Sequence, residues 1–282
     1  MEASRRKVKK RYRLALVLVL LLTAFAGKAW SDTMATPVLH RTSAKLADFP
    51  AGAAPVTIAL ISDIHVAGPD MPPERVATIV EQINRLKPDY LLVAGDFISE
   101  KRASTRLYSA KEAIAPLFKL DPAITKIAVP GNHDHWFNMM EIGNQLSAAG
   151  FNVMKNEAAQ YGPLVIGGLD DDYTGRADLP RTVASMGKFN GARLILSHSP
   201  DPFPDMPRSF GLMLAGHTHC GQIRYPWGGS PATMSRYGNR YACGIVSENG
   251  NELITTAGLG TSVLPFRLFS KPEIWLIEIG PQ

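Results

Sequence analysis

The 282-residue chain is 45% hydrophobic and 20% charged, and its formal net charge is +5. Residues 1–28 hold eight basic residues and one acid, so the rest of the chain carries 22 basic and 24 acidic side chains. This near-neutral balance excludes the large basic surface by which proteins bind nucleic acid, and the remaining length of about 230 residues suffices for one large domain with a buried core.

Residues 1–30 are predicted to be a signal peptide or an N-terminal membrane anchor. Seven basic residues precede an apolar run at 14–26. As a helix, this run would span about 20 Å, short of the ~30 Å hydrocarbon core. Ala24-Phe25-Ala26 resembles a signal-peptidase site, and residues 4–10 loosely resemble a twin-arginine export signal. The alternative is a buried helix at the start of the domain.

A signal peptide and a membrane anchor imply the same location for the rest of the chain. The positive-inside rule places the N-terminus in the cytoplasm and residue 31 onward outside the inner membrane. We therefore expect a protein of the bacterial cell envelope that contacts the membrane through its N-terminus.

Residues 31–55, rich in Ala, Thr, Ser and Pro, are predicted to be a linker, and residues 56–280 to be one domain. Apolar runs alternate with helical patterns along this domain, which indicates an α/β fold. In its first half we expect strands at 56–61, 90–94 and 124–129 and helices at 72–87, about 106–119 and 138–149. In its second half we expect strands at 164–169, 194–196, 212–215, about 241–247, 252–256 and 273–279.

Candidate ligands follow five of these strands at their carboxyl ends, where ligands bind in open α/β sheets. Taken singly, such blocks are usually turns, capped loops or core histidines; together they indicate one site. The five blocks are Asp63-Ile64-His65, Gly95-Asp96, Gly131-Asn132-His133-Asp134, Ser197-His198-Ser199 and Gly216-His217-Thr218-His219.

The residue types in these blocks suit two divalent metal ions. Asp63 and His65 are two apart, so in an extended segment both side chains can reach one ion, and Asp96 can bridge two ions through its carboxylate. Mixed oxygen and imidazole ligands favour manganese, with iron, zinc or magnesium as alternatives, over calcium. Two such ions ~3.5–4 Å apart can hold a phosphate ester and generate hydroxide from a bridging water.

His133 follows the candidate ligand Asn132 directly, so its side chain should point away from the ion that Asn132 binds. It is then free to protonate the leaving oxygen or to stabilise developing charge, with Asp134 expected to orient it. His40 and His135 lie outside the blocks and are predicted to be structural or solvent-exposed.

The two cysteines, Cys220 and Cys243, are too few for a disulfide framework. Export would allow them to pair, but the sequence does not show whether they are close. A ligand role for Cys220, beside His219, is disfavoured because a site of hard oxygen and imidazole ligands does not need a thiolate.

The motifs D-x-H, G-D, G-N-H-[DE], H and G-H-x-H, spread over nearly all of 56–280, resemble those of the calcineurin-like metallophosphoesterases. The resemblance implies a four-layer αββα sandwich with a dinuclear metal centre. It also implies roles for the individual residues: Asp63, His65 and His219 bind one metal; Asn132, His198 and His217 bind the other; Asp96 bridges; and His133 is the catalytic residue.

Further motifs are similar to those of a membrane-associated bacterial branch of this family: Asp170-Asp171, 197–201, 222–226, 258–262 and 272–274. That branch includes twin-arginine-exported phosphodiesterases and UDP-2,3-diacylglucosamine pyrophosphatases of lipid A synthesis. The resemblance implies hydrolysis of a phosphodiester or pyrophosphate bond in an envelope or lipid-linked substrate.

Several alternatives stay open. The lipid A substrate is made on the cytoplasmic face, whereas the charged N-terminus predicts that the domain faces the other way. Either the substrate is a different envelope phosphodiester, or the N-terminal segment does not translocate the domain.

A nuclease is disfavoured by the near-neutral charge of the domain. A non-catalytic, metal-stabilised scaffold should lack some ligands or the catalytic histidine, so the presence of all seven candidate ligands and His133 disfavours it. The apolar residues at 263–266 and 268–269 could contact lipid, but core packing is the expected role.

Overall fold

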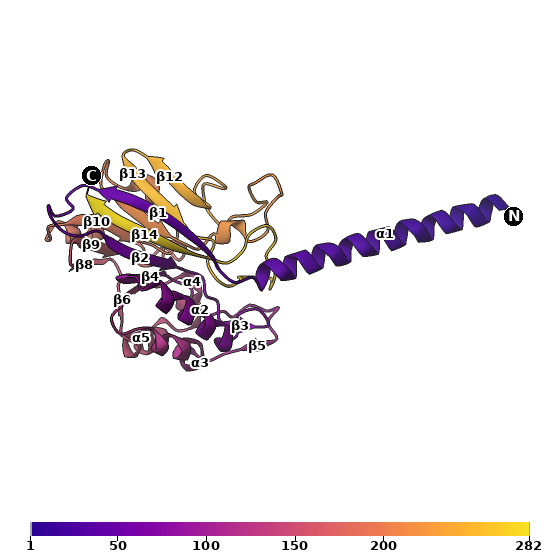
Figure 1. Ribbon diagram of the computed structural model, residues 1–282, viewed down its shortest axis with the longest axis horizontal. Helices are drawn as coiled ribbons and strands as arrows, with labels where there is room; N and C mark the ends of the chain where they lie inside the picture. The colour runs from indigo at the N-terminus through magenta and orange to yellow at the C-terminus, as the bar shows by residue number, and fades with distance from the viewer. Residues whose placement is uncertain (1, 282) are drawn as a thin grey trace.

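The computed structural model describes residues 2–281, which form an α/β domain and one long helix. The helix, α1 (Glu2–Thr33), extends away from the domain, and Figure 1 shows that it leaves at one end of the stacked sheets. The domain is built around two six-stranded sheets, and a small third sheet pairs β3 (Ala67–Gly68) with β5 (Arg106–Leu107).

The first sheet contains β1 (Val38–Leu46), β2 (Val56–Ile61), β4 (Tyr90–Ala94), β6 (Thr125–Val129), β7 (Phe151–Val153) and β14 (Glu273–Pro281). Its order is β1-β14-β2-β4-β6-β7, with all neighbours parallel except β14 and β2. Its outer face is covered by α2 (Pro73–Leu86), α3 (Ala110–Ile114) with the 3-10 turn η1 (Ala115–Lys119), and α5 (Met139–Ala148).

The second sheet contains β8 (Glu157–Tyr161), β9 (Leu164–Gly168), β10 (Ala192–Leu196), β11 (Leu212–Ala215), β12 (Gly244–Glu248) and β13 (Asn251–Thr255). Its order is β12-β13-β11-β10-β9-β8, with antiparallel strands only at the two edges. The helix α6 (Leu179–Met186) and the 3-10 turn η2 (Phe203–Asp205) pack on its outer face.

Alternate side chains of one strand lie in different layers of the core, which explains why the strands are apolar throughout. In β2, Ile58 and Leu60 pack between the two sheets, whereas Ala59 and Ile61 pack under the helices. A strand buried on both faces reads as a continuous apolar run. The layers are therefore helix, sheet, sheet and helix, which confirms the predicted αββα sandwich.

The prediction that residues 31–55 form a linker is wrong in its central part. Val38–Leu46 is the edge strand β1, paired with β14 along its whole length. Because β1 lies at an edge and most of its side chains are at least partly exposed, its sequence lacks the apolar run that marks the inner strands. The domain therefore begins before Val56.

Two other sequence predictions differ from the structure in detail. The expected helix at about 106–119 is divided into α3 and η1, with Pro116 at the start of the 3-10 turn, where it lacks the N–H that a continuing α-helix needs. The expected helix at 138–149 is preceded by a separate short helix, α4 (Asn132–Phe137), and the two meet at Asn138.

Candidate metal centre

All seven predicted ligands lie just beyond the carboxyl ends of inner strands. Those of the first sheet follow β2, β4 and β6, and those of the second follow β10 and β11. Because the two sheets face each other, loops distant in sequence meet at one edge. Every one of these side chains is buried: Asp63, His65, Asp96, Asn132, His198, His217 and His219.

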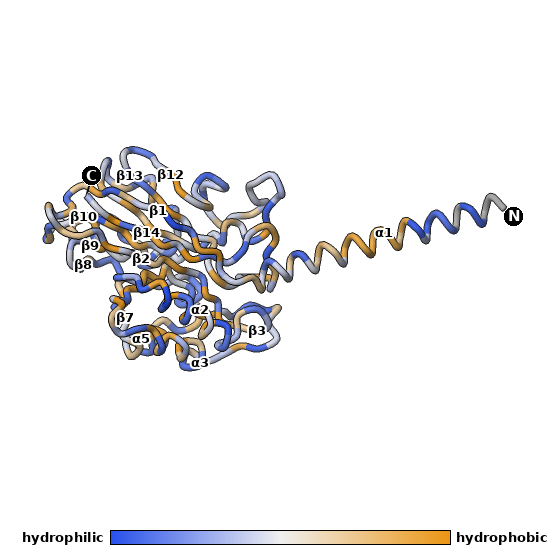
Figure 2. The backbone as a smooth tube through the Cα atoms, in the orientation of Figure 1, coloured by the Kyte–Doolittle hydropathy of each residue, from blue (hydrophilic) through white to orange (hydrophobic). Residues whose placement is uncertain are grey.

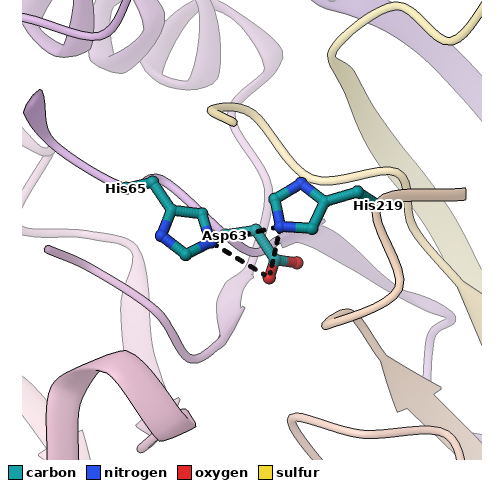
Figure 3. Close-up of side chains that lie close together, drawn as sticks. All are labelled: Asp63, His65 and His219. Atoms are coloured by element: carbon teal, nitrogen blue, oxygen red, sulfur yellow. Dashed lines mark hydrogen bonds and ion pairs between the residues drawn. The ribbon is translucent and has the colours of Figure 1, made fainter. Parts of the chain in front are cut away.

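Asp63, His65 and His219 form the first group of ligand atoms (Figure 3). Nε2 of His65 is 3.1 Å from Nε2 of His219. Oδ1 of Asp63 lies 3.4 Å from the His219 nitrogen and 3.8 Å from the His65 nitrogen. Three ligand atoms therefore face one small space and could hold one cation.

A second group lies beside the first. Nε2 of His198 is 3.1 Å from Oδ1 of Asn132 and 3.0 Å from Nδ1 of His217. Asp96 joins the two groups, since its Oδ2 is 3.3 Å from Nε2 of His198 and 3.4 Å from Nε2 of His65. One carboxylate oxygen thus faces both spaces, as a bridging ligand would.

The backbone around the ligands is held in an unusual conformation. Five of the seven have φ between 48° and 67°, in the left-handed region that non-glycine residues rarely adopt: Asp63, His65, Asp96, His217 and His219. Such conformations persist where the surrounding fold imposes them, and they cluster at functional sites. Gly95 also has positive φ, and a Cβ there would lie 2.8 Å from Nδ1 of His198, so only glycine leaves room for that ring.

Neighbouring groups orient the ligands. Oδ2 of Asp63 accepts hydrogen bonds from the Ser62 hydroxyl and from the backbone N–H of His217 (2.9 Å), which turns Oδ1 toward the cluster. Nδ1 of His198 is 2.7 Å from the Ala94 carbonyl, so Nε2 faces the cluster. Metal-binding histidines typically use their second nitrogen in this way.

Burial keeps three of the imidazoles in the cluster neutral, which leaves their nitrogens able to bind a cation. Burial lowers the pKa of His65 and His219 well below the usual value and that of His217 to about 3, so these imidazoles are neutral, the form that binds metal. Burial raises the pKa of Asp63 to about 6, and Oδ1 of this residue accepts no hydrogen bond within residues 2–281. A cation beside Oδ1 would stabilise the charged carboxylate.

Asp96 and His198 show the opposite trend. Burial alone would raise the pKa of Asp96, but the facing imidazoles of His198 and His65 outweigh it and hold that pKa well below its usual range. The same contact raises the pKa of His198 against the effect of burial. The Asp96 carboxylate is therefore charged at neutral pH.

His133 lies beside the cluster, with one ring nitrogen within 4.8 Å of ligand atoms of His65 and Asp96. Its orienting partner differs from the one expected from the sequence. Its Nδ1 is 3.1 Å from a carboxylate oxygen of Glu100, and its Nε2 is 3.4 Å from Oγ of Ser262. Burial lowers the pKa of His133, but the hydrogen bond to Glu100 and the charge of Asp96 outweigh it, and the pKa is raised.

The expectation that Asp134 orients His133 is wrong. Asp134 is fully buried and accepts hydrogen bonds from the backbone N–H groups of Asp96, Phe97 and Gly131, at 2.8–2.9 Å. It therefore fixes the two ligand loops against each other.

Sequence reasoning missed three further features of the site. Glu100 lies four positions after Asp96 in the same loop, and this short spacing in the sequence could have identified it as a residue of the site. Arg267 is fully buried in an apolar segment, and its Nη2 lies 3.2 Å from Nδ1 of His219. The half-exposed rings of Trp136 and Tyr173 contact His133 and His217, with ring centroids 4.9 Å apart in each contact.

The remaining cysteines and histidines lie outside the cluster. Cys220 and Cys243 form a disulfide, so Cys220 is not a thiolate ligand. His40 pairs with Glu273 at 3.1 Å, and His135 lies 2.6 Å from Oδ1 of Asp170.

Comparison with known proteins agrees with this geometry. The family model for calcineurin-like phosphoesterases matches residues 56–221, and the chain belongs to that family. It is therefore a phosphoester hydrolase, and the family implies divalent metal ions.

Particular relatives match over most of their length. The chain is 30% identical to the uncharacterized metallophosphoesterase YkuE of Bacillus subtilis, over 92% of this chain and 91% of that protein. It is also 30% identical to the phosphodiesterase YaeI of Escherichia coli, over 83% of this chain and 86% of that protein. A solved 5′-nucleotidase precursor from Thermus thermophilus superposes with a TM-score of 0.43 at 14% identity, covering 73% of this chain and 49% of that one.

Proposed function

We propose that this protein is a binuclear phosphodiesterase of the bacterial envelope that hydrolyses a phosphodiester or pyrophosphate bond in a lipid-linked substrate. The observation that carries the proposal is the single oxygen of Asp96 that faces both ligand groups, 3.4 Å from His65 and 3.3 Å from His198.

In this proposal each group of ligands holds one divalent cation. Asp63, His65 and His219 hold the first, Asn132, His198 and His217 hold the second, and Asp96 contacts both. Oxygen and imidazole ligands favour manganese, with iron, zinc or magnesium as alternatives. Once bound, the two cations would polarise the phosphoryl group and make a water molecule more acidic.

The chain's own residues supply the proton for the leaving group. His133 is the catalytic acid: the Glu100 carboxylate keeps Nδ1 protonated and orients the ring. The half-exposed rings of Trp136 and Tyr173 pack against His133 and His217, so they lie beside the proposed reaction site.

The proposed location rests on α1 and on the disulfide. Residues Lys9–Thr33 of α1 are long and apolar enough to cross a membrane by length and composition. Nine large apolar side chains between Leu14 and Phe25 are each more than half exposed, and Figure 2 shows this apolar middle between polar ends. Lipid would cover such a surface. The disulfide favours an oxidising compartment outside the cytoplasm for the domain.

The location bears on the substrate. A domain outside the inner membrane would not meet UDP-2,3-diacylglucosamine on the cytoplasmic face, so a phosphodiester or pyrophosphate of an outward-facing envelope lipid is the proposed substrate. UDP-2,3-diacylglucosamine is the alternative substrate, because the branch that the motifs at 197–201 and 258–262 resemble includes both exported phosphodiesterases and pyrophosphatases of this compound.

A direct experiment assays the purified full-length chain in detergent with Mn²⁺. The substrates are bis(p-nitrophenyl) phosphate and UDP-2,3-diacylglucosamine, and Asp96→Asn is the inactive control. Hydrolysis of the first that Asp96→Asn abolishes supports the phosphodiesterase. UMP release from the second would replace the proposed substrate by the lipid A precursor. Failure to hydrolyse either would contradict the proposal.

A further inference from the structure

Two neighbouring loops expose apolar side chains at the end of the domain where α1 leaves it. The first loop, residues 263–269, carries Val263 at 71% exposure and Leu264 at 47%, with Phe266 and Phe269 also exposed. This differs from the core packing expected from the sequence. Neither this loop nor the second one, residues 225–229, contains an acidic residue.

The two loops form one surface. The side-chain amide of Gln222 donates hydrogen bonds of 2.9 Å to the carbonyls of Leu264 and Phe266. The backbone N–H of Arg224 donates to the carbonyl of Leu268 at 2.9 Å, so the second loop begins directly beside the first. In the second loop the rings of Tyr225 and Trp227 are stacked at 5.3 Å, and Trp227 is 81% exposed. Exposed aromatic and aliphatic side chains on two braced loops are costly in water, and they indicate a surface that is covered in use.

The first loop is attached to the last turn of α1. The backbone N–H of Arg267 donates to Oγ1 of Thr33 at 2.6 Å, and that of Phe269 donates to Oδ2 of Asp32 at 2.9 Å. Asp32 and Thr33 are buried. The helix is therefore joined to the domain by contacts along its last turn, and the loop lies beside the point where the helix ends (Figure 1).

The aromatic residue at this junction indicates where the membrane surface would lie. The ring of Trp30, on the last turns of α1, contacts the ring of Phe266 edge-on at 6.3 Å. Tryptophan is enriched at the boundary between lipid headgroups and acyl chains. The ammonium group of Lys28 pairs with Asp32 and lies 5.0 Å from the Phe269 ring, so it holds that ring against the last turns of α1. If α1 spans the membrane, Phe266 lies at the same depth as Trp30.

The same loop leads to the metal centre. Ser262, directly before Val263, has its Oγ 3.4 Å from Nε2 of His133. Phe266 is four positions after Ser262 in the sequence, which is at most about 14 Å of chain. The catalytic histidine is therefore within a short distance of the residue that contacts the membrane-facing end of α1.

We propose that the exposed side chains of Val263, Leu264, Phe266 and Phe269, together with Tyr225 and Trp227, insert into the bilayer surface beside α1, and that the loop presents a phosphoester carried by a membrane lipid to His133. This inference rests on the proposed function in two respects, the membrane-spanning role of α1 and the hydrolysis of a lipid-linked phosphoester at His133. It adds the surface through which that lipid reaches the site from the adjacent leaflet.

Direct contact with lipid can be measured without using activity. The two native cysteines form a disulfide, so a cysteine at Leu264 is the only reactive thiol of the chain and accepts a polarity-sensitive fluorophore. Phe118 is the matched control, with 51% exposure against 47%. Phe118 lies near the edge of the first sheet where its parallel strands begin, far from the edge that carries the ligand loops. The carbonyl of its neighbour Lys119 accepts a hydrogen bond from Asn84, which is near the end of α2, and α2 leads into the start of β4.

The labelled full-length variants Leu264→Cys and Phe118→Cys are compared in nanodiscs of phosphatidylethanolamine and phosphatidylglycerol. The proposal predicts an apolar environment and quenching by brominated lipid at position 264, and neither at position 118. A water-like signal at both positions would overturn it. So would a signal at 264 that brominated lipid does not quench, because that result would indicate coverage by protein.

A second experiment tests delivery of the substrate. The variant Val263→Asp/Leu264→Asp and the control Phe118→Asp are assayed on two compounds with the same leaving group: dioleoyl phosphatidyl-p-nitrophenol in vesicles and soluble bis(p-nitrophenyl) phosphate. We expect the loop variant to lose about tenfold in kcat/KM on the vesicle substrate alone, from the lost apolar burial. Equal loss on both compounds, or no loss on either, would contradict the proposal.

The two experiments separate the two proposals. Wild-type protein that hydrolyses neither p-nitrophenyl compound would contradict the proposed function, and the fluorophore at position 264 would still report whether the loop meets lipid. Activity on the soluble compound with a water-exposed label would support the phosphodiesterase and reject the membrane surface.

Discussion

The carboxylate of Glu100 lies 3.1 Å from Nδ1 of His133. Glu100 is partly exposed, whereas His133 is largely shielded and faces the metal centre with its other nitrogen near Ser262. The carboxylate therefore fixes which nitrogen carries the proton in the neutral ring and favours the protonated imidazole. We therefore propose Glu100 as the positioning residue of His133, the proposed catalytic acid.

This assignment predicts a dependence on the leaving group. Glu100→Gln should lower kcat about tenfold, and His133→Ala about a hundredfold or more, on a phosphodiester with an alkyl leaving group, because an alkoxide needs a proton. Both losses should shrink on bis(p-nitrophenyl) phosphate, because p-nitrophenolate leaves without one. Steady-state kinetics on the two substrates measure this, and equal losses on both would show that Glu100 is only structural.

Removal of the bridging charge should cost metal as well as activity. Asp96→Asn replaces the charged oxygen that faces both ligand groups by a neutral amide. We expect the bound metal to fall from two ions per chain to one or fewer, and activity to fall by more than about 100-fold, the upper range for residues that only support ligands. Elemental analysis of the purified variant measures the metal. Asp170→Asn, whose carboxylate lies beside His135, is the matched control and should keep both ions.

The disulfide should stabilise the loop that follows His219. Cys220 and Cys243 are 23 residues apart in sequence, and a crosslink closing a loop of this size typically contributes about 3 kcal/mol. We expect Cys243→Ser, or a reductant, to lower the melting temperature measured by calorimetry. Since Cys220 directly follows His219, Mn²⁺ affinity should weaken as well. A melting temperature that is the same with and without reductant would refute this role.

The pair of His40 and Glu273 should stabilise the edge strand β1 in a pH-dependent way. The hydrogen bond to Glu273 raises the pKa of His40 above 6.5, so its contribution is full below that value and is lost as pH rises through the folded pKa. Burial tends to raise the pKa of Glu273, but the hydrogen bonds that it accepts from His40 and other donors outweigh burial and lower the pKa. The stability that Glu273 contributes is therefore lost in acid, as pH falls through its lowered pKa.

The expected effect of His40→Gln is therefore a loss of stability at pH 6 and little change at pH 8. The loss should be about 0.5 kcal/mol, because His40 is partly exposed and solvent screens the pair. Thermal unfolding in detergent at the two pH values measures it. A variant equally destabilised at both would show that stacking on Trp275, at 4.8 Å, carries the contact.

The sequence predicted the parts of this molecule that repeat a simple physical pattern. Strands such as β2 and β4 are buried on both faces and read as apolar runs, and the polar residues directly after them lie where parallel strands place ligands. The seven predicted ligands converge because that rule places every one of them at the same edge.

The missed features depend on tertiary contacts that no local pattern encodes. The strand β1 is held by β14, more than 200 positions away in the sequence, so its own half-exposed side chains resemble those of a linker. Glu100 and Asp134 are both acidic neighbours of a ligand, and only the fold shows that Glu100 contacts His133 while Asp134 binds backbone.

The central claim, a phosphodiesterase that uses two metal ions, is tested most directly by titrating metal into chelated protein. The full-length chain is stripped with a chelator, Mn²⁺ is added in known ratio, and hydrolysis of bis(p-nitrophenyl) phosphate is followed. We expect activity to rise until two ions per chain are bound, and we expect the variant Asp96→Asn not to recover activity. Full activity without added metal, or a plateau at one ion per chain, would contradict it.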